Sequence, residues 1–164
     1  MAAREMERVS PVFGEQLVAL HHVGSTAIPG VKAKAILDLL PVVRDIEAME
    51  ALRPEFEALG YAWWHDFGMP GRRYLTLDHP QTGRRLAQLH CFQQDSLHVD
   101  RHVAFRDYLI AKPELAREYG RIKAHCAALH GDDANAYTAC KNPWIRQVEF
   151  EAVKWMHAGG KSAS

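Results

Sequence analysis

The chain has 164 residues, of which 48% are apolar and 24% are charged, so it is long enough and apolar enough to bury the core of one globular domain. Its 20 basic and 20 acidic side chains leave a formal net charge of zero, which argues against nucleic-acid binding driven by bulk charge. No apolar run approaches the length of a membrane span, and the N-terminus lacks the apolar core of a signal sequence, so no membrane partner is expected.

The first third of the chain is predicted to contain a helix, two strands and a second helix. Residues 11–20 read as a short helix leading into a first strand over 20–24. A second apolar run, 35–43, is also predicted to be a strand. Residues 45–59 have helical spacing, and we expect Pro54 to kink that helix or split it in two.

The middle of the chain is predicted to add an antiparallel meander to these strands. Residues 61–65 are aromatic and strand-like, whereas 66–71 hold two glycines and a proline and are predicted to be a loop. Two further strands, 72–78 and 84–92, flank a hairpin turn at 79–83. The sheet is therefore expected to be mixed and to have about five strands.

After Gln93 the pattern turns helical. One helix is predicted to have Pro113 in its first turn and to run to His130, where Gly131 ends it. Asp132 or Asp133 is expected to cap a last helix that runs towards Met156 and is interrupted by Pro143.

These elements predict an α+β fold, a mixed sheet followed by a mainly helical C-terminal half. No repeat or linker divides the chain, so residues 1–158 are expected to form one domain and 159–164 a disordered tail. The cysteines lack zinc-type spacing, which favours a reduced, cytoplasmic setting. They are Cys91, Cys126 and Cys140.

The first candidate site is the turn His22–Gly30, which lies between the first two predicted strands. Backbone N–H groups exposed at Gly24 can hold an anion such as phosphate, and the hydroxyl of Ser25 can donate to a phosphate oxygen. Lys32 and Lys34 follow the turn, and Lys34 directly precedes the second strand, where it is a candidate for phosphate contact. The plainer alternative is a strand-ending turn with solvated lysines.

Asp38 is the second candidate, because it stands inside an apolar strand where a charge is costly unless it is paired or bound to metal. A carboxylate beside a phosphate site predicts a divalent cation, Mg²⁺ or a similar ion, between them. The alternative is a buried salt bridge with Lys34 or an arginine. His90, two residues from Gln88 on one strand face, is a candidate metal ligand or a group that orients an attacking hydroxyl, with a hydrogen-bonded core histidine as the alternative.

Cationic side chains from the rest of the chain are candidates for the same cleft. Arg72 and Arg73 must face opposite sides of a strand, so one of them is expected to neutralise phosphate charge and the sequence does not say which. Tyr137 and Lys141 lie one helical turn apart and are expected, with Arg106, to line the cleft between sheet and helices. Ordinary ion pairs are the alternative for all of these charged groups.

Several segments resemble the GrpB family, within the nucleotidyltransferase superfamily. They are His22–Gly30, Lys34–Leu40, Arg72–Leu75, Leu89-His90, Arg101–Leu109 and Tyr137–Lys141. The resemblance covers nearly the whole chain and implies a nucleotidyltransferase-like fold. The family is also found as a domain fused to dephospho-CoA kinase, and the resemblance implies no known reaction.

The chain departs from the polymerase-type pattern, in which two carboxylates alternate on one strand and both point at the metals. Ile36 and Leu40 occupy the positions two residues from Asp38, and Gln88 stands where the family usually has a further histidine. These departures argue against efficient two-metal catalysis. The carboxylates that folding can bring to Asp38 instead are Asp66, Asp78 and Asp107.

Three functions follow from this pattern. The first is an enzyme that transfers a nucleotidyl group from a nucleoside triphosphate to a small-molecule acceptor, with Asp38 holding the metal and His90 assisting. The second is a domain that binds a nucleotide or another phosphorylated ligand without turnover, and the third is a purely structural helper domain. In the first two, the phosphate-binding set is Gly24, Ser25, Lys34, Arg72, Arg73 and Lys141.

Overall fold

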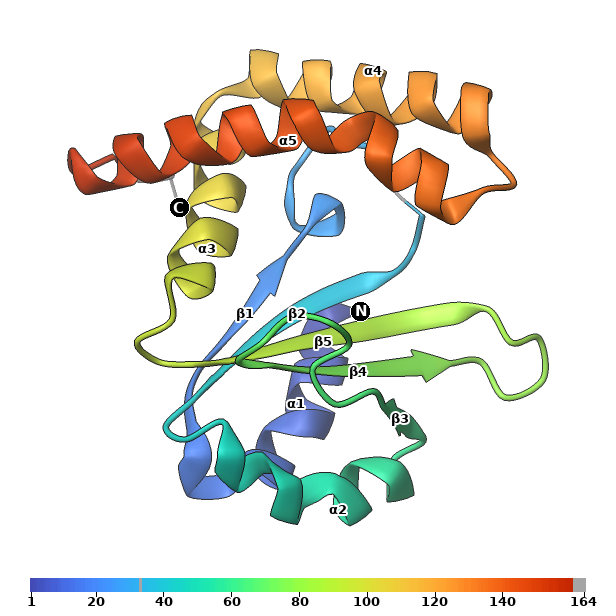
Figure 1. Cartoon of the computed structure of the whole chain (residues 1–164), viewed down its shortest axis with the longest axis vertical. Coiled ribbons are helices and arrows are strands. Elements are labelled where there is room, and N and C mark those ends of the chain that lie inside the picture. Colours follow the sequence, from blue (N-terminus) through green and yellow to red (C-terminus); the bar gives the residue numbers. More distant parts are fainter. Residues whose placement is uncertain (33, 161–164) are drawn as a thin grey trace.

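The computed structural model describes residues 1–32 and 34–160. A five-stranded sheet in the order β1-β2-β5-β4-β3 forms the middle layer (Figure 1). Its strands are β1 (Leu17–Val23), β2 (Leu37–Val43), β3 (Tyr61–Trp63), β4 (Arg72–Asp78) and β5 (Arg85–Gln93). The strands β2 and β5 are parallel and the other neighbours antiparallel, which confirms the predicted mixed sheet.

Strand register places the polar residues of the sheet on one face. Asp38 of β2 lies opposite Gln88 of β5, and His90 of β5 lies opposite Tyr74 of β4. Because side chains alternate along a strand, these four share a face, and Leu39 and its neighbours in register point the other way.

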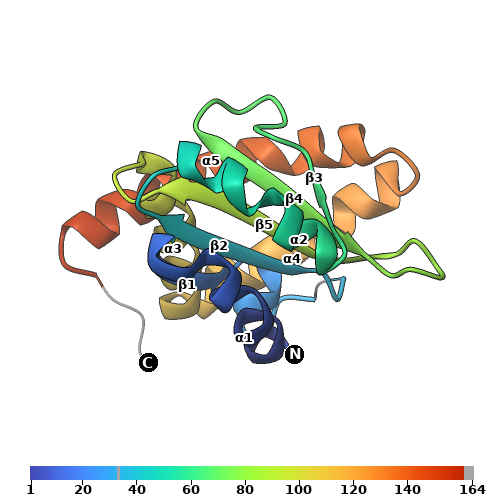
Figure 2. The same ribbon diagram turned by 90° about the horizontal axis from the view of Figure 1, so that it is seen from below.

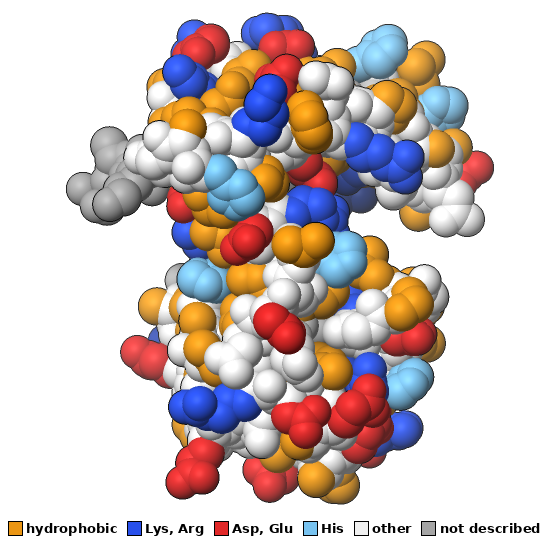
Figure 3. Space-filling model, turned by 60° about the vertical axis from the view of Figure 1, so that its left-hand side comes forward, with side chains coloured by type: hydrophobic (Ala, Val, Ile, Leu, Met, Phe, Trp, Pro, Cys, Tyr) orange, Lys and Arg blue, Asp and Glu red, His pale blue; other side chains and the backbone are white. Residues whose placement is uncertain are grey.

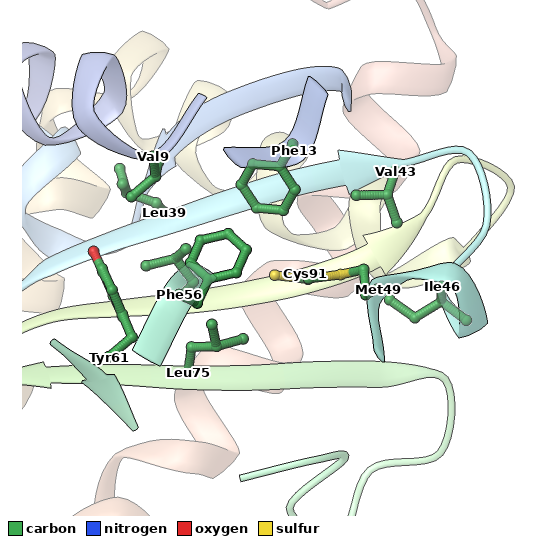
Figure 4. Close-up of a cluster of buried hydrophobic side chains, with 11 residues drawn as sticks. Val9, Phe13, Leu39, Val43, Ile46, Met49, Phe56, Tyr61, Leu75 and Cys91 are labelled. Atoms are coloured by element: carbon green, nitrogen blue, oxygen red, sulfur yellow. The ribbon is translucent and has the colours of Figure 1, made fainter. Parts of the chain in front are cut away.

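The other face of the sheet is covered by α1 (Ala2–Phe13), the 3₁₀ segment Glu47–Leu52 and α2 (Arg53–Ala58), as Figure 2 shows from below. The core lies here, with Phe13 and Phe56 in edge-to-face contact at 5.0 Å between ring centroids (Figure 4). Its buried members are Val9, Phe13, Leu39, Val43, Ile46, Met49, Phe56, Tyr61, Leu75, Leu89 and Cys91.

Three helices form the C-terminal half and stand over the polar face: α3 (Leu97–Ala111), α4 (Pro113–His130) and α5 (Ala134–His157). The side chain of Asp133 caps α5 by accepting from the amide of Ala136 at 3.0 Å. The helices α4 and α5 run antiparallel as a hairpin (Figure 1) and are joined by a disulfide between Cys126 and Cys140. The expectation of reduced cysteines is therefore wrong for this pair, whereas Cys91 is free and buried.

The α+β class and the helical C-terminal half are confirmed, and the remaining differences have local causes. The first helix is α1 rather than 11–20, because Val9 and Phe13, one turn apart, are both buried against the sheet. The chain divides at Pro54 as predicted, but α5 continues through Pro143.

The end of α5 is followed by two hydrogen-bonded glycines. The amides of Gly159 and Gly160 donate to carbonyls of the last turn of α5. Residues 161–164 of the predicted tail lie outside the described residues.

Among the helices of residues 1–32 and 34–160, none is long and apolar enough to cross a membrane.

Candidate functional site

The turn after β1 presses against Asp38. Gly24 has φ +74, a conformation that L side chains rarely adopt, and a Cβ atom there would lie 2.6 Å from Asp38 Oδ2. The ring Nε2 of His22 lies 2.8 Å from Thr26 Oγ1, and Arg106 Nη1 donates to the His22 carbonyl at 3.1 Å. The turn is thus held from both ends, and only glycine at position 24 permits its approach to the carboxylate.

The carboxylate of Asp38 is paired with a histidine from the neighbouring strand. Nε2 of His90 lies 3.0 Å from Asp38 Oδ1, so the prediction that the two side chains meet is confirmed, and a histidine takes the place of the lysine or arginine partner considered above. The His90 ring lies 5.4 Å from Tyr74 and 5.9 Å from His102, centroid to centroid. The His90 ring is therefore held in place, and the other carboxylate oxygen of Asp38, Oδ2, faces the Gly24 turn.

A cavity of about 500 Å³ lies beside this pair, between the sheet and the α4–α5 hairpin. The surface is hollowed between the two halves of the molecule, where Lys, Arg and His side chains lie among acidic and hydrophobic ones (Figure 3). A smaller cavity of about 250 Å³ shares Lys34 and Ile36 and adds Arg84 and Arg85. The larger one is lined by Ser25, Lys32, Lys34, Ile36, Asp38, Gln88, Gly120, Lys123, Ala124, Ala127, Ala134, Tyr137, Thr138 and Lys141.

The charge in the larger cavity is strongly unbalanced. Four lysines line it, and Asp38 is the one acidic side chain among its lining residues. Lys123 Nζ donates to Ser25 Oγ at 2.8 Å, which joins α4 to the turn. Lys141 Nζ lies 4.5 Å from the centroid of the Tyr137 ring. Convergent ammonium groups around a hydroxyl form a site for a multiply charged anion.

Burial and mutual repulsion weaken the protonation of these lysines. Burial is the main reason that the pKa of Lys123 falls to about 8, and the charges of Lys141 and Lys34 lower it further while Asp38 raises it. Burial also lowers the pKa of Lys141, against the raising effect of Asp38. An anion in the cavity would raise the pKa of both lysines, because it would offset the repulsion between neighbouring positive charges.

Seven of the predicted site residues lie in the cavity lining or against Asp38. Ser25, Lys34, Asp38, Tyr137 and Lys141 line the cavity, while Gly24 and His90 contact Asp38 from either side. The cavity also uses Lys123, which sequence reasoning missed. Its spacing with Gly120, Ala124 and Ala127 marks one helix face, but small residues on a helix do not show what they face.

The three candidate arginines lie outside the cavity lining. Arg73 faces the core, 3% exposed, and donates to Glu47 and Glu50, so its assignment to phosphate is wrong. The reason is strand alternation, which puts Arg73 opposite buried Cys91. Arg72 shares the face of Asp38 but donates to the carbonyls of Asp66 and Phe67, and Arg106 holds the backbone before the turn.

Within the described part of the chain, no second carboxylate joins Asp38 to complete a metal cluster. In residues 1–32 and 34–160, no three His, Cys, Asp or Glu side chains gather closely enough to hold a metal ion. The three candidates are engaged elsewhere: Asp66 accepts from the Gly68 amide, Asp78 pairs with Arg85, and Asp107 pairs with Arg106. A single carboxylate fits Mg²⁺ only when ligand phosphates supply most of its oxygen shell.

The chain is similar in sequence to two longer proteins. The chain is 40% identical over 153 residues to the UPF0157 protein YqkA of Bacillus subtilis (strain 168), covering 92% of this chain and 43% of YqkA. It is 25% identical over 181 residues to a dephospho-CoA kinase of Mycolicibacterium paratuberculosis, of which it covers 44%. The chain therefore spans less than half the length of these two relatives.

A solved structure matches over nearly the whole length of both chains. The crystal structure of the conserved protein GrpB from Enterococcus faecalis superposes with a TM-score of 0.86 at 35% identity, covering 93% of this chain and 90% of that one. The family model described as GrpB protein matches residues 1–151. The chain therefore belongs to the GrpB family.

Proposed function

We propose that the lysine-lined cavity binds the polyphosphate group of a nucleoside triphosphate. The observation that carries this proposal is the convergence of four lysines and the Ser25 hydroxyl on a cavity with one carboxylate. Neutral ligands would leave these ammonium groups repelling one another. A polyphosphate neutralises them and accepts hydrogen bonds from both Lys123 and Ser25.

Asp38 has a separate role in this proposal, because a bare carboxylate repels phosphate. Together with phosphate oxygens, Asp38 would hold Mg²⁺, which supplies positive charge between the two groups. His90 donates to Oδ1 and keeps the carboxylate oriented, with Oδ2 towards the Gly24 turn. Mg²⁺ alone is therefore expected to bind weakly.

Thermal shift measurements with ATP test the two roles separately. In the wild type, ATP with Mg²⁺ should raise the melting temperature more than ATP alone, and Mg²⁺ alone should change it little. Asp38→Asn should remove the Mg²⁺-dependent increment and keep or strengthen the effect of ATP alone, because a repelling charge is lost. An increment that survives in Asp38→Asn would place the metal elsewhere, and no ATP effect in any form would reject the proposal.

Nucleotidyl transfer is the second candidate, and the Asp38–His90 pair is the observation that favours it. An acceptor hydroxyl would lose its proton to solvent, and its oxygen would bond to the α-phosphorus while the bond to pyrophosphate breaks; Asp38 would hold the Mg²⁺ that makes this hydroxyl more acidic. The lysines would hold the departing pyrophosphate.

This activity is tested by pyrophosphate release from each of the four nucleoside triphosphates with Mg²⁺ or Mn²⁺ and a panel of hydroxylated small molecules. Release that disappears in Asp38→Ala supports transfer. Release that persists in Asp38→Ala comes from another site or a contaminant, and ATP binding without any release leaves the binding function alone.

A further inference from the structure

The hairpin of α4 and α5 has two ends that differ in packing. At one end Tyr119 and Trp144 stack at 5.4 Å between ring centroids, and Val148 is buried beside them. Over residues 120–142, which we call the hairpin tip, Cys126 is the one side chain that is buried. The tip therefore has little apolar core to hold its two helices together.

Every helical residue of the large cavity belongs to this tip. Two of them are partly buried cations, Lys123 on α4 and Lys141 on α5, and the charge of Lys141 lowers the pKa of Lys123. The position of the lysines thus depends on how the tip is held. The residues are Gly120, Lys123, Ala124, Ala127, Ala134, Tyr137, Thr138 and Lys141.

The disulfide joins the two walls at the level of these lysines. Cys126 lies one helical turn after Lys123, and Cys140 directly precedes Lys141. Cys126 is 1% exposed, whereas Cys140 is partly exposed and can be reached from solvent. With the crosslink present, the two lysine-bearing turns are fixed relative to each other despite their repulsion.

We propose that opening and closing of the Cys126–Cys140 disulfide regulates how tightly the cavity binds polyphosphate. The inference rests on the proposed function. The oxidised form holds the lysines convergent, and reduction lets the tip separate and weakens binding. Because the two cysteines are 14 positions apart in the chain, the open form gains substantial chain freedom that ligand binding must then remove.

Reduction of the Cys126–Cys140 disulfide uses a small-molecule thiol as the reductant. Its thiolate attacks Sγ of Cys140, the S–S bond breaks, and Cys126 leaves as a thiolate that takes a proton. A second thiol then attacks the mixed disulfide and releases Cys140 as a thiol. Two thiols are oxidised to one small-molecule disulfide, and one protein disulfide is reduced to two thiols.

Tripolyphosphate titration by calorimetry tests the proposal on the whole chain, in oxidised protein and after treatment with dithiothreitol, with mass spectrometry to count thiols. Reduction should weaken binding roughly five- to tenfold. Cys126→Ser and Cys140→Ser should bind weakly with or without reductant. Cys91→Ala, at a cysteine in the sheet core, should keep the full redox effect. Equal affinity in the oxidised and reduced wild type, or failure of the pair to oxidise, would overturn the proposal.

Hydrogen exchange tests the effect of the disulfide on the hairpin tip independently of whether the cavity binds polyphosphate. Amides of residues 120–141 should exchange faster after reduction, and those of β2 and β5 should not. If tripolyphosphate binds neither form, the proposed function fails, and faster exchange of the tip would still support the role of the disulfide in holding the tip together. Unchanged exchange would overturn it.

Discussion

The two faces of the sheet use the same strands for different purposes. Leu39 and Leu89 are 0% exposed in the core against α1 and α2, while their strand neighbours Asp38 and His90 form a polar pair on the opposite face. One face is closed by apolar packing, and the other is left with a charge-lined cavity. Substitutions on the core face are therefore expected to change mainly stability, and substitutions on the opposite face mainly ligand binding.

The adjacent arginines of β4 show the same division. Arg73 is buried against Glu47 and Glu50 on the core side, whereas Arg72 lies on the polar face and holds the loop at Asp66 and Phe67. A one-residue step along a strand thus separates a structural ion pair from the neighbourhood of the site.

The largest effect is expected from Leu89→Ala, which should lower the free energy of unfolding by about 2–5 kcal/mol because it opens a cavity in the core. Its neighbour change, His90→Ala, should cost about 1 kcal/mol, the value of one hydrogen bond, and should mainly weaken Mg²⁺-ATP binding. Urea denaturation measures both. Equal losses from the two variants would show that the faces are not distinct.

Gly24→Ala should damage the site strongly, because its Cβ would meet Asp38 Oδ2 at 2.6 Å. We expect a loss of Mg²⁺-ATP affinity of roughly thirtyfold, as 2 kcal/mol of misplacement implies. Gly30→Ala is the matched control: its φ is +83 but nothing lies within 4 Å of the added atom, so it carries the backbone strain alone. Calorimetry that finds the two variants alike would contradict the close approach.

Binding should also depend on pH through Lys123. Its pKa of about 8 in the free protein means that the ammonium form must be regained when an anion binds above that pH. Tripolyphosphate affinity should therefore be constant below about pH 7 and fall by up to about tenfold per pH unit above 8. Lys123→Arg keeps its charge, so its profile should show only the titration of the ligand and of Lys141, whose pKa burial also lowers. Parallel pH profiles of wild type and variant would refute the role of Lys123.

The smallest effect on the cavity is expected from Arg73→Met. Because Arg73 lies on the far face, tripolyphosphate affinity should change by less than about twofold, within the range of independent sites. Circular dichroism checks that the variant is folded. A larger loss of affinity would mean that the two faces are coupled.

Local pattern predicted the strands and the Asp38–His90 pair well, because alternation and apolar runs are properties of neighbouring residues. It failed for Lys123, because its role depends on how α4 is placed over the sheet, 98 residues from Ser25 along the chain. It failed for the disulfide, because that bond depends on how α4 and α5 pair as a hairpin. For Arg72 and Arg73, strand alternation leaves two options, and only the register of β4 against β5 decides between them.

The central claim is that the lysines of the hairpin bind polyphosphate, and calorimetric titration of tripolyphosphate tests it most directly. Lys123→Ala and Lys141→Ala together should weaken binding by about a hundredfold, because two charge-assisted contacts are lost. Lys154→Ala, an exposed lysine on the same helix as Lys141, should bind like the wild type. Equal affinity in the double variant and the Lys154→Ala control would contradict the account.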